Sequence, residues 1–221
     1  QIKDFIEGVR SMSIRGVACT IPHKIIVMQY LDVIDPIAQK IGAVNTIVNE
    51  DGTLTGYNTD WLGFLRPLEK ITSLESKIVA LLGAGGAARA VAYAINERGG
   101  NLRIYNRTVE KAQEIVREFG GKAFGFDELE HVKDTDIIVN ATSVGLHPKE
   151  DETPLPKEYI TPNHIVFDLV YPVKTRLLKD AKKQGATTIE GVEMLLYQGM
   201  EQFKLYTGHA APEEDMRRVL L

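Results

Sequence analysis

Apolar and polar residues follow two periods along this chain, one typical of helices and one typical of strands. In residues 1–12 the apolar side chains recur at helical spacing, and the apolar run 17–21 predicts a strand. A helix that leads into a buried strand is typical of the second half of a β-α-β unit, whose first strand precedes the helix. The sequence opens with Gln1 on this helix, so either the domain starts unusually or a further N-terminal segment carries that strand, and we expect the latter.

The next part of the chain, up to residue 70, predicts short elements separated by turns. Asp35-Pro36 breaks one helical stretch, and Glu50-Asp51-Gly52 lies between two β-rich runs, which indicates a hairpin. The expected elements, in order, are a helix over 23–30, a short helix ending at Gly42, strands over 43–49 and 53–57, and a helix from Asp60 to about Lys70.

A second series begins at Lys77. The expected strands cover 78–82, 102–105, 136–140, 165–170 and 187–189, and the expected helices cover 86–98, 109–119, 174–184 and 192–206. Alternation of this kind favours an α/β fold built on parallel sheets. We therefore expect two units, residues 1–62 and 63–192, with the tail 193–221 free to pack on either.

Composition narrows the class of protein. Of 221 residues, 44% are apolar and 25% charged, which is typical of a globular protein. The net charge of −4 comes without a basic block that would attract nucleic acid or a membrane surface, and no apolar run approaches the roughly 20 residues that span a bilayer. A single cysteine, Cys19, fits a reducing, cytoplasmic compartment. The five histidines show no metal-ligand spacing, so we expect no metal.

A glycine-rich turn joins the predicted strand 78–82 to the helix that follows it. The turn comprises Gly83, Ala84, Gly85, Gly86 and Ala87. In a dinucleotide-binding turn the first glycine allows the tight bend, the second lets the backbone approach a pyrophosphate, and the phosphates lie on the free amides of the helix. The alternative is a turn whose glycines serve only close packing of strand and helix.

The following strand, 102–105, distinguishes the two dinucleotides. Proteins that prefer NAD place a carboxylate at its end to hold the ribose 2′-hydroxyl. This chain instead has Asn106, Arg107 and Thr108, with Lys111 one turn later, and no carboxylate between Asn101 and Val109. An arginine pairs well with a 2′-phosphate, so we infer NADP rather than NAD. The alternative is that these cations are ordinary surface residues.

Two charged residues stand at predicted helix starts. Lys24 follows Pro22, and proline suits a first helical turn, where a cation is disfavoured and an amine becomes a candidate proton-transfer group. Asp60 lies in the first turn of the next long helix, where a carboxylate is stabilised. The alternatives are a surface lysine and a simple helix cap. If Lys24 and Asp60 meet, their environments oppose each other: the helix start favours a neutral amine, and the carboxylate favours a protonated one.

Other polar residues carry weaker signals. Asn45 and Thr46 lie in a predicted strand, where polar side chains commonly face water, and Gln198 lies in the middle of a predicted helix, usually a solvated position.

Together these motifs resemble the shikimate dehydrogenase family. The matching segments occur in family order: Gly16–Lys24, Gly42–Thr46, Gly56–Gly63, Gly83–Ala87, Asn106–Thr108, Asp168–Pro172, and Gly191–Leu195 with Gln198. The Thr-x-Pro-x-Lys and Asn-Thr-Asp motifs are specific, whereas the glycine turn alone is not. The family's N-terminal strand, with its Ser-x-Ser-Pro motif for the substrate carboxylate, is not in this sequence, so we expect a substrate pocket that lacks a wall. The sequence Val-Ala-Cys-Thr at residues 17–20 is similar to that of family members fused to a 3-dehydroquinate dehydratase. This similarity indicates that the chain could be part of a longer polypeptide.

The resemblance implies reversible NADP-dependent reduction of 3-dehydroshikimate to shikimate in chorismate biosynthesis. It implies an α/β fold with a Rossmann-type NADP-binding domain, 63–192, and a smaller substrate-binding domain, 1–62, completed by helices in 193–221. Lys24 and Asp60 match the family's catalytic pair. The implied substrate-binding residues also include Thr20, Asn45, Tyr171 and Gln198. The implied NADP-binding residues are the glycine-rich turn, Asn106, Arg107, Thr108, Lys111, Leu169 and Gly191.

The resemblance leaves alternatives open. Family members are monomers or dimers. A quinate or dual quinate/shikimate dehydrogenase shares the fold, and a carboxylate in place of Arg107 would have favoured NAD and that activity. A non-catalytic metabolite sensor on the same fold is the third alternative, which the loss of Lys24 or Asp60 would have suggested.

Overall fold

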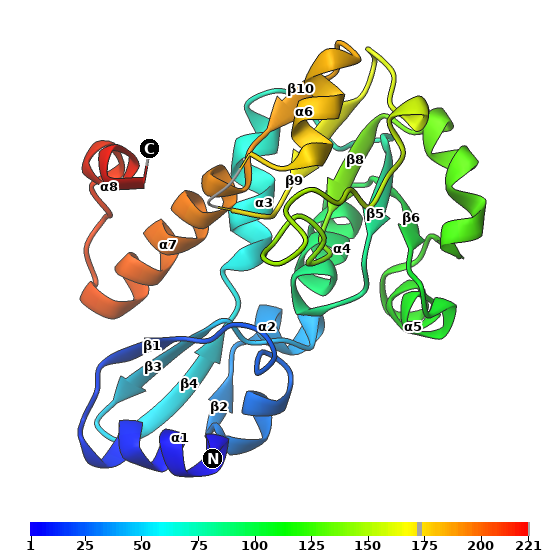
Figure 1. Cartoon of the computed structure of the whole chain (residues 1–221). Coiled ribbons are helices and arrows are strands. Elements are labelled where there is room, and N and C mark those ends of the chain that lie inside the picture. Colours follow the sequence, from blue (N-terminus) through cyan, green and yellow to red (C-terminus); the bar gives the residue numbers. More distant parts are fainter. Residues whose placement is uncertain (172–173, 221) are drawn as a thin grey trace.

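The computed structural model describes residues 1–171 and 174–220, and Pro172 of the Asp168–Pro172 motif lies outside that range. Within these residues the chain forms two separate sheets, one of four strands near the N-terminus and one of six strands (Figure 1). The predicted α/β architecture is therefore confirmed.

The small sheet is mixed. Its strands are β1 (Gly16–Ala18), β2 (Val33–Ile34), β3 (Thr46–Glu50) and β4 (Thr53–Tyr57), in the order β1-β3-β4-β2. The predicted hairpin is confirmed, because β3 and β4 pair antiparallel from Thr46↔Tyr57 to Glu50↔Thr53. The prediction of parallel strands is wrong here except for the β2–β4 pair, since a two-residue connection can join only antiparallel neighbours.

The helices of this part are α1 (Ile2–Ser11) and α2 (Pro36–Ile41), which match the prediction. The helix expected over 23–30 is wrong. The chain instead passes a cis Ile21–Pro22 bond and a turn, and then forms a short 3₁₀ helix, η1 (Ile26–Tyr30). The run Ile25-Ile26-Val27 is β-branched, and such side chains disfavour a regular α-helix.

The large sheet is parallel throughout, with the order β10-β9-β8-β5-β6-β7. Its strands are β5 (Ile78–Leu82), β6 (Asn101–Tyr105), β7 (Lys122–Phe124), β8 (Ile137–Asn140), β9 (Ile165–Asp168) and β10 (Thr187–Ile189). The order runs one way from β5 to β7 and the other way from β8 to β10. The direction therefore reverses between β5 and β8, and in such sheets ligands bind at the carboxyl ends beside this point.

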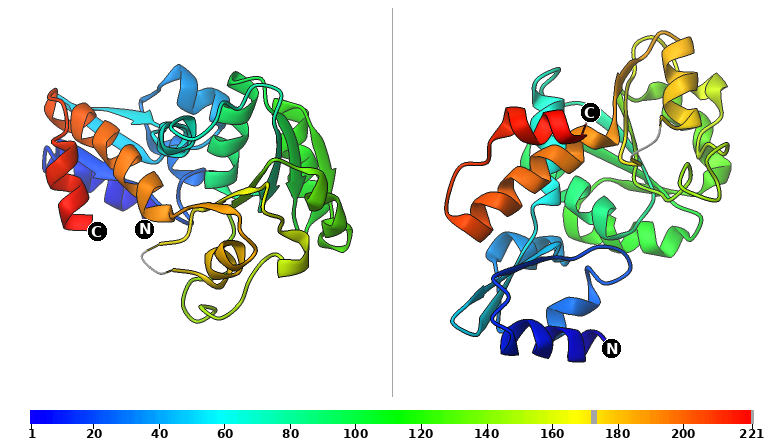
Figure 2. Two further views of the ribbon diagram at one scale, coloured as in Figure 1. Left: turned by 90° about the horizontal axis from the view of Figure 1, so that it is seen from above. Right: turned by 60° about the vertical axis from the view of Figure 1, so that its left-hand side comes forward.

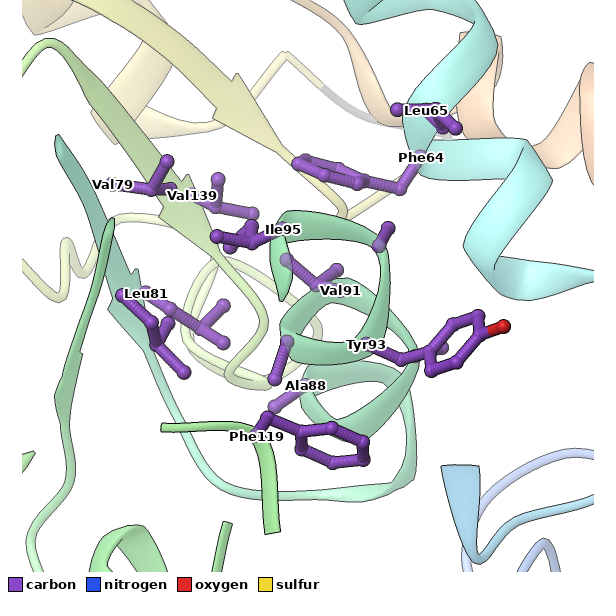
Figure 3. Close-up of a cluster of buried hydrophobic side chains, with 14 of the residues drawn as sticks. Phe64, Leu65, Val79, Leu81, Ala88, Val91, Tyr93, Ile95, Phe119 and Val139 are labelled. Atoms are coloured by element: carbon purple, nitrogen blue, oxygen red, sulfur yellow. The ribbon is translucent and has the colours of Figure 1, made fainter. Parts of the chain in front are cut away.

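Helices cover both faces of the large sheet. One apolar cluster joins alternate residues of the strands, such as Leu81 and Val139, to α3 (Asp60–Glu69), α4 (Gly86–Glu97) and α5 (Val109–Phe119) (Figure 3). The opposite face, with Ala80 and Leu82, packs against η2 (Phe126–Asp134), η3 (Lys157–Tyr159) and α6 (Arg176–Lys183). The alanines of α4 bring this helix close to the strands. β7 and η2 were not predicted, because their patterns are short and irregular.

The helix α7 (Gly191–Thr207) connects the two parts of the molecule. It lies along α3 and extends to the small sheet, and α8 (Glu213–Leu220), which was not predicted, folds back beside it (Figures 1 and 2). Two glycines permit this packing. A Cβ on Gly63 would lie 2.8 Å from the carbonyl oxygen of Met194, and a Cβ on Gly16 would overlap the ring of Tyr206.

Candidate active site

A cluster of polar side chains lies where the small sheet, α3 and α7 meet. Its members come from four distant parts of the sequence: Lys24, Asn45, Thr59, Asp60 and Gln198. Hydrogen bonds connect all of them, and Asn45 contacts three of the other four. A polar network this far from solvent is stable only when its members satisfy one another.

Lys24 and Asp60 form a close ion pair. The Lys24 Nζ atom lies 2.5 Å from Asp60 Oδ2, and the side chains are only 12% and 5% exposed. The amine and the carboxylate predicted at separate helix starts therefore meet. Of the two, the carboxylate is the more buried and the more firmly held.

Asp60 is the first residue of α3, as predicted. Its backbone N–H donates to Asn58 Oδ1 (3.0 Å), and Asn58 Nδ2 donates to the carbonyl of Ala43 (2.9 Å). The positive end of the helix dipole favours a carboxylate at this position. Asn58 thus ties the start of α3 to the segment before β3.

Asn45 corrects an expectation. A water-facing strand position was one interpretation for Asn45 and Thr46, but Asn45 is 2% exposed and Thr46 is fully buried. Asn45 Nδ2 donates to Asp60 Oδ1 (2.8 Å) and to Thr59 Oγ1 (2.9 Å), and its Oδ1 accepts from the Thr59 N–H (2.8 Å). This amide therefore orients the Asp60 carboxylate. No period-two pattern could reveal it, because Asn45 precedes β3.

The helix α7 contributes two glutamines. Gln198 Oε1 lies 3.4 Å from Asn45 Nδ2, so its side chain faces the cluster rather than solvent. Gln202 was missed by the sequence analysis; its Nε2 donates to Thr46 Oγ1 (3.0 Å) and to the Asn45 carbonyl (3.3 Å). The i, i+4 spacing of two glutamines on one helix face was the available signal.

The surroundings of Lys24 differ from the prediction. Lys24 lies in the turn before η1, not in the first turn of an α-helix, so a helix dipole does not act on its amine as expected. Its carbonyl accepts from the Val44 N–H (2.8 Å). Its side chain runs across Gly86, where an added Cβ would lie 3.3 Å from Lys24 Cβ. Lys24 therefore joins the polar cluster to the glycine-rich turn.

The glycine-rich turn has the shape that a dinucleotide requires. Gly83 has φ +107°, and an added Cβ would lie 3.0 Å from the Ala141 carbonyl, so only glycine fits. Among the described residues, nothing lies within 4 Å of a Cβ added at Gly85, and no side chain caps the amides at the start of α4. Open space in front of free amides suits a pyrophosphate.

The end of β6 presents the predicted cations. Asn106 Nδ2 donates to the Thr108 carbonyl (2.8 Å), which holds this loop, and the side chains of Arg107 and Lys111 are exposed. The Gly83 N–H donates to the Tyr105 carbonyl (2.8 Å), so this loop and the glycine-rich turn lie at the same edge of the sheet. The arrangement suits a 2′-phosphate.

A second buried network lies beside the turn, at the ends of β8 and β9. Asp168 accepts from Asn140 Nδ2 (2.9 Å) and Thr175 Oγ1 (2.6 Å), and burial raises the pKa of its carboxyl. Thr142 Oγ1 donates to Asn140 Oδ1 (2.7 Å), and its methyl group lies against Gly83. The sequence analysis assigned no role to this network, which supports the loop below the turn.

The remaining predicted residues lie around these two regions. The backbone of Leu169 lies against Gly191, where an added Cβ would be 2.8 Å from the Leu169 carbonyl. Tyr171 is 43% exposed in the loop after β9. Thr20 is exposed and lines a hollow of about 350 Å³ beside β1, together with Cys19 and His23. The structure does not bring Thr20 or Tyr171 into hydrogen-bond contact with the cluster, among the residues that it describes.

Fold and site define a Rossmann-type dinucleotide-binding protein with a second, smaller α/β part. Three family profiles match it: "Shikimate dehydrogenase substrate binding domain" over residues 1–47, "Shikimate / quinate 5-dehydrogenase" over 67–184, and "Shikimate 5'-dehydrogenase C-terminal domain" over 191–221. The chain belongs to the shikimate dehydrogenase family.

Individual relatives agree with this assignment. The chain is 44% identical to the shikimate dehydrogenase (NADP(+)) of Moorella thermoacetica, over 97% of this chain and 77% of that protein. A bifunctional 3-dehydroquinate dehydratase/shikimate dehydrogenase of Arabidopsis thaliana is 41% identical over 95% of this chain and 38% of its own length. The structure of the Thermus thermophilus shikimate 5-dehydrogenase in complex with NADP(H) and shikimate aligns with a TM-score of 0.90 at 39% identity, over 99% of this chain and 82% of the other.

No helix within 1–171 and 174–220 is long and apolar enough to cross a membrane. Over the same residues, no group of three or more His, Cys, Asp and Glu side chains is arranged to hold a metal ion.

Proposed function

We propose that this chain is an NADP-dependent oxidoreductase that interconverts shikimate and 3-dehydroshikimate. The observation that carries the proposal is the contact between its two regions: the Lys24 side chain pairs with Asp60 and also lies against Gly86 in the glycine-rich turn. A proton-transfer pair beside a dinucleotide site is what a reversible alcohol oxidation needs. The family membership supports the same reaction.

The residues for the cofactor follow from the shape of the turn. The backbone amides at Gly85, Gly86 and Ala87 would hold the pyrophosphate, and Arg107 with Lys111 would pair with the 2′-phosphate. Asn106 and Thr108 would support that phosphate site, and Leu169 and Gly191 would line the far side. When bound, NADP supplies a nicotinamide carbon that exchanges a hydride with the substrate.

Lys24 and Asp60 handle the proton. In the direction of reduction, the Lys24 ammonium donates a proton to the carbonyl oxygen of 3-dehydroshikimate while the carbonyl carbon accepts the hydride. In the direction of oxidation, the Lys24 amine takes that proton back. Asp60 holds the amine 2.5 Å away and offers an acceptor to a substrate hydroxyl, and Asn45 keeps the carboxylate in position.

Substrate hydroxyls would find their other partners close by. Asn45 and Gln198 face this cluster, and Thr20 and Tyr171 would approach it from their exposed loops. We also propose the division into a substrate-binding domain, residues 1–62 with 193–221, and an NADP-binding domain, residues 63–192. The matches of separate family profiles to residues 1–47 and 67–184 support that division.

The setting of the enzyme is the last part of the proposal. A single cysteine supports a reducing, cytoplasmic compartment. We propose a monomer or a homodimer. The bifunctional Arabidopsis thaliana relative supports the idea that a polypeptide of this family can carry a further activity.

A crossed assay tests the proposal. The complete polypeptide is incubated with shikimate or quinate, and with NADP⁺ or NAD⁺, while reduced dinucleotide is measured by absorbance. We expect the highest kcat/KM for shikimate with NADP⁺. Higher kcat/KM for quinate with NAD⁺ would support the quinate dehydrogenase alternative, and no turnover with any pair would support a metabolite sensor.

A further inference from the structure

Arg89 extends from α4, the helix that follows β5, to the part of the molecule that contains the small sheet. It lies in the first turn of α4, three residues after Gly86. Its Nε atom donates to the carbonyl oxygen of Ile41, the last residue of α2, at 2.5 Å, and the Arg89 side chain is only 14% exposed. A guanidinium that satisfies a terminal helix carbonyl is favoured by the negative end of the helix dipole.

The guanidinium has three further neighbours. It pairs with Glu118 near the end of α5 and lies over the ring of Phe119, 5.8 Å from the centroid. On the other side lies Gly42, where an added Cβ would be 2.7 Å from Arg89 Nη2. Gly42 has φ +69°, so glycine both ends α2 and leaves room for the arginine.

The segment that Arg89 holds leads directly to the proton-transfer pair. Ala43 accepts from Asn58, whose own side chain accepts from the Asp60 N–H. Val44 donates its N–H to the Lys24 carbonyl. Two of the three residues after Ile41, Ala43 and Val44, therefore support Asp60 and Lys24.

The first turn of α4 thus contacts the same group of residues at two points. Gly86 lies against the Lys24 side chain, and Arg89 donates a hydrogen bond to the last residue of α2. With one contact alone, the part that contains the small sheet could rotate about that contact. Two contacts fix its orientation relative to the glycine-rich turn. An arginine is suited to this role because its Nε–H donates from a rigid, planar guanidinium group.

We propose that Arg89 is a positioning residue: its contact with the end of α2 sets the distance between the Lys24–Asp60 pair and the glycine-rich turn. This inference rests on the proposed function. Arg89 touches neither Lys24 nor Asp60, so its loss should leave binding of each ligand intact and slow the chemical step. A shift of about 1 Å in such geometry commonly lowers a rate by about 100-fold.

The test compares Arg89→Ala with Arg89→Lys and with Glu118→Ala in the complete polypeptide. Glu118→Ala is the matched control, because it removes the exposed partner of the same guanidinium and leaves the Ile41 bond. We expect Arg89→Ala to lower kcat by at least about tenfold, with the dissociation constants of NADPH and shikimate, each measured alone, within about twofold of wild type. Arg89→Lys, which keeps a cation at this helix end, should recover most of kcat. Glu118→Ala should change kcat by less than about twofold.

Two further readouts separate positioning from a loss of fold. The primary deuterium isotope effect on kcat should rise in Arg89→Ala, because hydride transfer becomes rate-limiting. Amide hydrogen exchange at Gly42 and Val44 should accelerate, while exchange in β5 stays unchanged. If the alanine variant does not fold, Arg89→Gln replaces it with the same expectations.

The outcomes are distinct. Wild-type kcat and isotope effect in Arg89→Ala would overturn the positioning role, and so would an equal loss in Glu118→Ala. An inactive wild-type enzyme would overturn the proposed function instead. In that case unchanged exchange at Gly42 and Val44 in Arg89→Ala would still reject the inference, and faster exchange would still support the contact.

Discussion

The polar cluster around Lys24 and Asp60 and the loop around Arg107 are opposite kinds of site. The cluster is buried, and its side chains satisfy one another across three or more elements. The loop at Arg107 is exposed, and the side chain of Asn106 holds it by donating to the Thr108 carbonyl two residues later. A site for proton transfer must be fixed before the substrate arrives, whereas a phosphate site needs charge and accessible donors.

This difference predicts how each region responds to change. In the cluster, removal of one member leaves a buried partner unsatisfied, so effects on catalysis should be large. At the exposed loop, removal of a cation should reduce affinity for one dinucleotide and leave the fold intact.

Lys24→Ala should have the largest effect. We expect the rate of hydride transfer to fall by about 10³-fold, because general acid–base groups contribute on that order, while shikimate still binds. Pre-steady-state NADPH formation and a shikimate titration measure the two quantities. Lys40→Ala, an exposed lysine on α2, is the control. Turnover near the wild-type rate would remove Lys24 from the chemistry.

Arg107→Ala should change the affinity for the cofactor and leave the other properties of the enzyme unchanged. We expect KM for NADPH to rise about 10- to 100-fold and KM for NADH to change little, because only the former has a 2′-phosphate to pair. Arg117→Ala, an exposed arginine at the other end of α5, should leave both constants unchanged. Equal losses for both dinucleotides would contradict 2′-phosphate recognition.

Gly63→Ala tests the packing that brings Gln198 to the cluster. The added Cβ would lie 2.8 Å from the Met194 carbonyl and 2.9 Å from Gln198 Cβ, so α3 and α7 must separate. We expect the free energy of unfolding to fall by about 2 kcal/mol and KM for shikimate to rise. Urea denaturation measures the first. Gly199→Ala, whose Cβ would make only an ordinary 3.5 Å contact with Met216, should not destabilise the protein.

Substitution of His164, which lies far from both regions, should have the smallest effect, and it should act on the pH dependence of stability. Burial lowers the pKa of its imidazole below the usual 6.5, and its Nδ1 accepts from the Thr161 N–H, which also favours the neutral ring. The unfolded chain therefore binds a proton first as the pH falls below about 6.5, and stability is lost in that window. His164→Asn should flatten the dependence of the urea midpoint between pH 7 and pH 5. A slope in His164→Asn equal to that of the wild type would contradict the assignment.

Local pattern predicted what is local in the chain. The glycine-rich turn, the cations after β6 and the position of Asp60 at a helix start are each contained in a few consecutive residues, and each appears as expected. The burial of Asn45 and the contribution of Gln202 depend on α7 crossing to the small sheet, which no sequence window contains. The turn at Lys24 was misassigned as a helix, since the β-branched run after it was outweighed by the proline signal.

The most direct test of the account is a crystal structure of the complete polypeptide with NADP⁺ and shikimate. We predict one shikimate hydroxyl within hydrogen-bond distance of both Lys24 Nζ and an Asp60 carboxylate oxygen, with the nicotinamide ring beside the same carbon. Shikimate bound away from this pair, for example in the hollow lined by Thr20 and Cys19, would contradict it.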